Sequence, residues 1–90
     1  MNSNEYVIVA TIAANYESNH GMDEDSALKN AERDYLKFKK LAPKTWQSLW
    51  NRDTWDDRRI GKHIYTLIMG WVGSGMSFKN YCADLDDAII

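Results

Sequence analysis

Four basic residues recur at spacings of four, four and three along residues 29–40. In a helix with 100° per residue, these positions fall within an arc of about 80°, so the side chains form one row of positive charge. Such a row can bind phosphates or an acidic protein surface, because its charges act together. An ordinary solvated helix face has the same pattern, and the sequence leaves both interpretations open. The members of this basic row are Lys29, Arg33, Lys37 and Lys40.

The sequence RDTWDDRR at residues 52–59 places arginines beside aspartates and a tryptophan. The charged side chains are expected to form local ion pairs, although Arg58 and Arg59 could instead bind phosphate or carboxylate groups. Trp55 is predicted at the start of a helix, pointing roughly opposite to Ile64 and toward Arg59 and Lys62, where it either packs against the short helix before it or is exposed. Tryptophan beside arginine is typical of an interface hot spot, and the ring could also stack on single-stranded nucleic acid.

The other tryptophans are expected in the core. Three of the four lie within residues 44–55, and Trp46 and Trp50 are four residues apart, which puts both rings on one helix face. Trp71 falls on the apolar stripe of a later helix and should be buried. Trp55 is therefore the one tryptophan predicted to act in binding.

No residue pattern is typical of a metal site or of catalysis. His20 is expected in a loop, and His63 lies on the flank of a helix without an acidic residue spaced to fix its tautomer. Cys82 is the only cysteine and is expected to be buried. The glycines at 73–75 lack the strand–loop–helix context of a phosphate-binding loop. We therefore predict no metal, no cofactor and no enzyme activity.

Length and composition are those of one folded domain, residues 1–90. The chain is 44% hydrophobic and 27% charged, well away from the composition of disordered proteins. A lone cysteine favours a reducing compartment. The first apolar run has no basic segment before it, so it is not expected to be a secretion signal. It also breaks after about ten residues, too few to span a bilayer. A soluble cytoplasmic protein without membrane contact is expected.

The net charge of −2 conceals an uneven distribution. Residues 1–28 contain five acidic side chains and no lysine or arginine, whereas residues 29–62 contain ten of the eleven basic side chains. Residues 63–90 return to a small acidic excess. This acidic, basic, acidic layout is the feature of the composition that bears on function.

Turn-forming residues divide the chain into five segments, which predicts an all-α domain of five short helices. The first segment, 4–18, is ambiguous, since Tyr6–Val9 has strand propensity while the alanine-rich continuation favours a helix. A helix is preferred, and its apolar residues surround most of the circumference, so it should be largely buried.

The second helix is predicted to start with a cap at Asp23 or Asp25 and to end near Leu41, because Pro43 disfavours helical geometry at Ala42. Its inward stripe follows three-four spacing. The stripe comprises Leu28, Ala31, Tyr35, Phe38 and Ala42.

Three further helices complete the prediction. Residues 44–51 form a short helix or turn, and the central helix starts at a cap on Asp53 or Thr54. The last helix starts at Ser77. Its inward residues are Phe78, Tyr81 and Cys82, and its outward residues are Asp84, Asp86 and Asp87.

These features together predict a small non-enzymatic protein-binding module, a regulator or inhibitor that docks on a larger protein. The predicted contacts are Trp55, Arg58, Arg59 and Lys62, with the basic row as an electrostatic rim. Self-association through the same surface would bury aromatic area that a small core leaves exposed. The alternative is a nucleic-acid-binding protein that uses the basic row and the nearby arginines.

Overall fold

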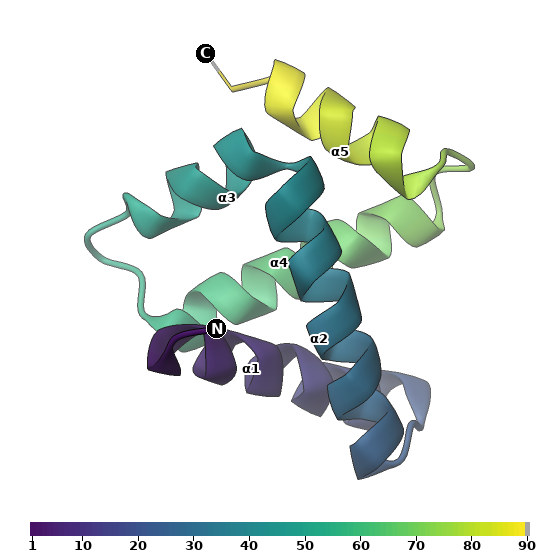
Figure 1. Ribbon diagram of the computed structural model, residues 1–90. Helices are drawn as coiled ribbons and strands as arrows, with labels where there is room; N and C mark the ends of the chain where they lie inside the picture. Colours follow the sequence, from purple (N-terminus) through teal and green to yellow (C-terminus); the bar gives the residue numbers. More distant parts are fainter. Residues whose placement is uncertain (90) are drawn as a thin grey trace.

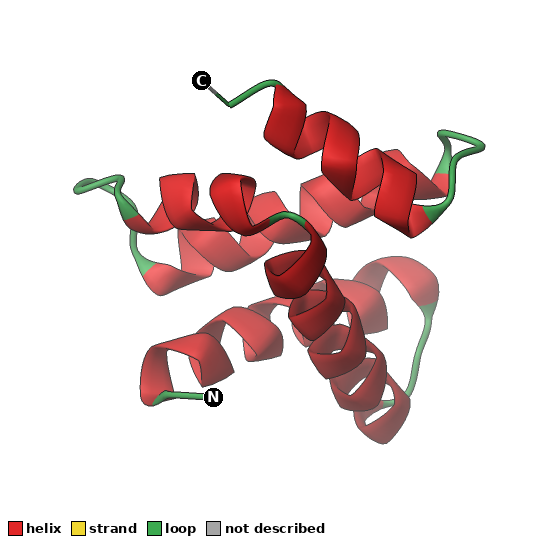
Figure 2. Cartoon of the chain, turned by 45° about the horizontal axis from the view of Figure 1, so that its top comes forward, coloured by secondary structure: helices red, strands yellow, loops and turns green. Residues whose placement is uncertain are grey.

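Five α-helices joined by short loops make up residues 1–89, the part of the chain that the computed structural model describes (Figure 1). No strand occurs in that part (Figure 2), so the all-α prediction is confirmed and residues 4–18 are helical. The helices are α1 (Ser3–His20), α2 (Glu24–Leu41), α3 (Pro43–Trp50), α4 (Asp57–Val72) and α5 (Phe78–Asp87).

Side-chain caps and glycine fix most of the helix boundaries. The Asp23 side chain accepts a hydrogen bond from the Ser26 amide and caps α2, as predicted. Helix α1 stops at Gly21, whose φ of 66° is the left-handed conformation that glycine adopts without strain. The predicted start of α4 is wrong: its cap is Asp56, which accepts from the Arg59 amide at 2.8 Å. Trp55 therefore lies in the loop just before the helix.

Helix α1 packs against both α2 and α4, and α2 crosses in front of both in Figure 1. Only one side of α1 is covered, so the prediction that it is largely buried is wrong. Tyr6 is 60% exposed, and Val7, Ala10 and Ala14 are also exposed. The buried face of α1 comprises Glu5, Ile8, Val9, Ile12, Ala13 and Tyr16.

The core face of α2 is rotated slightly from its predicted position. Ala27 is fully buried, whereas Leu28 is 42% exposed, contrary to the prediction that Leu28 faces the core. Ala27 and Ala31, with their small side chains, lie at the middle of the buried face where α2 packs on α1. Leu28 therefore lies at the edge of that face. Ala31, Tyr35 and Phe38 are buried as predicted.

The backbones of α1 and α4 approach closely at Gly61. A β-carbon on Gly61 would lie 2.9 Å from the Ile8 carbonyl oxygen and 2.9 Å from the Thr11 β-carbon. A glycine inside a helix costs about 1 kcal/mol relative to alanine, and here it permits the helix crossing. Ile60 and Ile64 are buried on either side of this crossing.

A buried polar cluster joins the first three helices. The Glu5 side chain is almost inaccessible, and its Oε2 accepts hydrogen bonds from the Tyr35 hydroxyl at 2.7 Å and from Lys39 Nζ at 2.9 Å. Trp46 Nε1 in turn donates to the Tyr35 hydroxyl at 3.0 Å. Trp46 and Trp50 contact each other edge to face at 5.4 Å and pack half-buried against the core. Both rings therefore contribute to the fold, although, like Trp71, neither is fully buried.

Asp86 of α5 caps the beginning of α3. Ala42 precedes α3 and has no side-chain acceptor, so the first amides of that helix need an acceptor from elsewhere. Asp86 accepts from the amides of Lys44 and Thr45, at 3.2 and 2.9 Å, and from the Thr45 hydroxyl at 2.8 Å. The prediction that Asp86 faces outward is therefore wrong, whereas Asp84 and Asp87 are exposed.

Replacing Asp86 by alanine is expected to lower the free energy of unfolding by about 1–2 kcal/mol, since the first amides of α3 lose their acceptor. Asp84→Ala is the matched control, because it makes the same change in the same helix at an exposed position. Urea unfolding followed by circular dichroism would compare the two variants. Equal stability of the two would show that Asp86 does not act as a cap.

Candidate interaction site around Trp55

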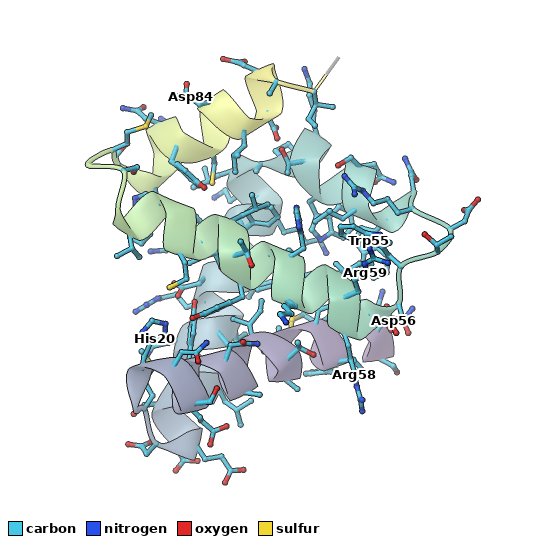
Figure 3. The ribbon with its side chains drawn as sticks, turned by 180° about the vertical axis from the view of Figure 1, so that it is seen from behind. His20, Trp55, Asp56, Arg58, Arg59 and Asp84 are labelled. Carbon is cyan, nitrogen blue, oxygen red and sulfur yellow. The ribbon has the colours of Figure 1, made fainter. Side chains whose placement is uncertain are left out.

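The Trp55 ring lies between two guanidinium groups. The Arg52 and Arg59 Cζ atoms are 4.2 and 4.6 Å from the ring centroid. The ring itself is half-buried and packs against the edge of the core, so Trp55 is not simply exposed. Figure 3 shows Trp55 and Arg59 side by side where the α3–α4 loop meets α4. Each contact has cation–π geometry, so the two arginines hold the ring in place.

Local backbone structure brings these side chains together. The Trp55 amide donates to the Arg52 carbonyl at 3.1 Å, which closes a turn and places Arg52 against the ring. Asp56 then caps α4 by accepting from the Arg59 amide, so Arg59 belongs to the first helical turn directly after Trp55. The turn and the cap therefore set the positions of both arginines.

One face of α4 continues the site. Lys62, His63 and Thr66 follow Arg59 at spacings of three, four and seven, which align on a helix. With Trp55 and Arg59 they line an open cavity of about 320 Å³. The His63 ring contacts Trp55 edge to face at 5.2 Å. We call Arg52, Trp55, Arg59, Lys62 and His63 the Trp55 cluster.

The Trp55 cluster carries positive charge that ion pairs in the described chain do not neutralise. The ion pairs of residues 1–89 join Arg33 to Asp34 and Lys39 to Glu5, and neither involves the cluster. Burial lowers the pKa of His63, and the nearby positive charge of Arg52 lowers it further. The neutral imidazole is therefore favoured, and Arg52, Arg59 and Lys62 supply the charge that faces solvent.

Arg58 lies apart from the Trp55 cluster. Its side chain lines a separate hollow with Val7, Ala10 and Asn15 of α1, and Figure 3 shows it pointing away from Trp55. Successive helical residues project about 100° apart, so Arg58 and Arg59 face different directions. The structure thus brings together Trp55, Arg59 and Lys62 and separates Arg58 from them.

The basic row is accessible to solvent. Lys29, Arg33, Lys37 and Lys40 are all exposed on α2, which lies in front of α1 in Figure 1. None of the four lines the cavity beside Trp55, and their role as an electrostatic rim stays a prediction. Sequence reasoning omitted Arg52 and His63 from the site. The three-residue spacing of Arg52 and Trp55 across a turn was the available signal for Arg52.

His20, Cys82 and Trp71 have structural rather than chemical surroundings. His20 is the last residue of α1 and not a loop residue as predicted, and its Nε2 lies 2.9 Å from the Tyr65 hydroxyl. Cys82 is buried, and burial raises the pKa of its thiol to about 11. Trp71 is half-buried and not fully buried as predicted; its Nε1 donates to the Met76 carbonyl. Within residues 1–89, no three potential metal ligands converge.

Comparison of this chain with protein-family models, with curated proteins and with solved structures finds no match. Among the helices of the described residues, none combines the length and the apolar character needed to span a membrane. The function of the chain is therefore inferred from the geometry of its own residues.

Proposed function

We propose that this chain is a small non-enzymatic protein-binding module, a regulator or inhibitor that docks on a larger cytoplasmic protein through the Trp55 cluster. The observation that carries the proposal is the half-buried Trp55 ring held between Arg52 and Arg59 beside an open cavity. Tryptophan and arginine are the residues most enriched at interface hot spots. A ring already held in place loses little conformational entropy when a partner binds.

The proposed partner presents acidic side chains next to an apolar one. Arg59 and Lys62 are exposed on the same face of α4 and have no acidic partner in an ion pair among residues 1–89. A carboxylate of the partner can accept two parallel hydrogen bonds from the Arg59 guanidinium. The cavity beside Trp55 and His63 then receives the apolar side chain.

The test compares affinity capture from native cells by wild type, Arg59→Glu and Arg58→Glu. The two variants make the same charge change at adjacent exposed positions, but only Arg59 contacts Trp55. We expect Arg59→Glu to reduce binding of the purified partner about thirtyfold or more, since hot spots contribute about 2 kcal/mol or more, and Arg58→Glu to leave it within about twofold. A partner that both variants bind equally well would refute the site.

Two other kinds of partner are distinguished by further measurements. Binding to a single-stranded oligonucleotide through the basic row and the nearby arginines would weaken steeply with salt, because each phosphate contact releases a counterion. Self-association would appear as a concentration-dependent mass in sedimentation equilibrium that Arg59→Glu abolishes. Either result would replace the larger protein as the partner in the proposal.

A further inference from the structure

A groove forms where the end of α1, the first half of α2 and the end of α4 meet. Its volume is about 260 Å³, and its floor is made by the buried side chains of Tyr16 and Ile68. Met22, Met69 and Trp71 supply apolar walls. Arg59 of the Trp55 cluster and Trp71 of the groove are near opposite ends of α4, roughly 18 Å apart along its axis at 1.5 Å per residue, and the two sites share no lining residue, so the groove is a separate feature.

The walls combine a fixed surface with an adaptable one. The Trp71 indole donates to the Met76 carbonyl at 2.8 Å and packs edge to face on Phe78 at 5.0 Å, which fixes the ring. Met22 and Met69 are flexible and polarizable, so they adjust to ligands of different shape. Val72 at the rim is 65% exposed and extends the apolar surface outward.

Arg33 and Asp34 form an ion pair at the polar end of the groove, which His20 and Asn30 also line. Both oxygens of Asp34 accept hydrogen bonds, one from the Tyr16 hydroxyl at 2.8 Å and one from Arg33 Nε at 3.1 Å. The guanidinium of Arg33 has five N–H donors, and within residues 1–89 only that Nε makes a side-chain hydrogen bond. The terminal nitrogens of Arg33, on a side chain that is 58% exposed, are therefore free to donate to an acceptor with the planar geometry of a carboxylate.

We propose that this groove binds a small apolar carboxylate, with one aromatic ring or a short aliphatic chain as its body. The body packs against Trp71, Met22 and Met69, and the carboxylate accepts from the terminal nitrogens of Arg33. The volume is below the roughly 300–1,000 Å³ of pockets for drug-sized molecules, which favours a ligand of that size. An ammonium ligand is less well matched, because the unused groups of the pair are mainly the N–H donors of Arg33, whereas each Asp34 oxygen already accepts one hydrogen bond.

The experiment is a titration of ¹⁵N-labelled protein by NMR with 4-phenylbutyrate. The four tryptophans supply indole signals from different places, so the Trp71 signal reports on the groove and the Trp55 signal on the other site. We expect the Trp71 signal to move with a Kd of about 1 mM, as for a ligand of this size. The signal of Trp55 should stay in place. 4-Phenylbutylamine and 4-phenylbutan-1-ol have the same body with other head groups and should bind more weakly.

Three variants test the head group separately from the body. Arg33→Gln should weaken 4-phenylbutyrate about tenfold or more without changing the affinity of the alcohol, because hydrogen bonds to charged groups contribute most. Lys37→Gln removes a cation from the same α2 row at a position that does not line the groove, and should change neither affinity. Val72→Asp changes an exposed rim residue and should also weaken the carboxylate by charge repulsion.

Some results would overturn the proposal. It is wrong if 4-phenylbutyrate leaves the Trp71 signal unchanged at 10 mM, a concentration roughly ten times the expected Kd. It is also wrong if the amine binds as well as the acid, or if Arg33→Gln and Lys37→Gln weaken binding equally. None of these outcomes bears on the Trp55 cluster, whose partner is tested through Arg59.

Discussion

Replacing Gly61 by valine is expected to destabilise the fold by about 3 kcal/mol, a large share of the 5–15 kcal/mol typical of small domains. The added β-carbon would lie 2.9 Å from the Ile8 carbonyl oxygen and from the Thr11 β-carbon. Both belong to the rigid part of α1, so relief requires that α1 move away from α4 and open the core at Ile8 and Ile64. The better helix propensity of valine recovers only a few tenths of a kcal/mol.

Gly73→Val is the matched control for this prediction. Gly73 has a φ of −90°, and no neighbouring atom lies within 4 Å of the place that a β-carbon would take, so valine is tolerated there. In urea unfolding monitored by tryptophan fluorescence, the free energy of unfolding of Gly61→Val should be well below that of wild type. The value for Gly73→Val should lie within about 0.5 kcal/mol of wild type. If the two variants unfold at the same urea concentration, α1 and α4 do not cross closely at Gly61.

The helices themselves were predictable from local signals. Asp23 and Pro43 mark the ends of α2, and the alanine-rich continuation after Tyr6–Val9 outweighs the strand propensity of that segment. These signals work because capping and backbone restriction act within a few residues along the chain. The start of α4 was misplaced because several residues that can cap a helix occur together, and only the tertiary structure shows that Asp56 is the cap.

Features that depend on contacts between distant segments were not predictable. Asp86 caps α3 across an interval of about forty residues, so no local pattern distinguishes it from its exposed neighbours Asp84 and Asp87. The need for a glycine at position 61 is also non-local, because it arises from the close approach of the α1 backbone to α4. The exposure of Leu28 depends on which small side chains of α2 meet α1.

The candidate site was predictable only where its residues share one helix. Arg59 and Lys62 are three residues apart on one helix, so their common face follows from helix geometry. Arg58 was grouped with them because it is adjacent in sequence, although adjacent helical residues diverge. Arg52 reaches Trp55 through a turn whose geometry the sequence alone does not specify.

Replacing Glu5 by alanine is expected to lower the free energy of unfolding by about 2–3 kcal/mol. The change leaves the buried Tyr35 hydroxyl without its acceptor and breaks the contact with Lys39. Loss of a buried ion-pair partner costs up to about 5 kcal/mol, but the Lys39 side chain is 38% exposed and its ammonium can reach water, which reduces the cost. Glu17→Ala, at an exposed position of the same helix, is the control and should stay within about 0.5 kcal/mol of wild type.

The same carboxylate predicts how stability depends on pH. Burial alone would raise the pKa of Glu5, but the hydrogen bonds from Tyr35, Lys39 and the Asn2 amide outweigh it and hold the pKa below the ordinary value of 4.5. The folded protein therefore binds this proton less readily than the unfolded chain, so the stabilisation is complete above pH 4.5 and is lost as the pH falls through the lower folded value. Glu5→Gln has no such titration. The stability advantage of wild type over Glu5→Gln, measured by urea unfolding from pH 7 to pH 3, should be constant above about pH 5 and shrink below it. An advantage that stays constant down to pH 3 would show that Glu5 is not held as a carboxylate in the folded protein.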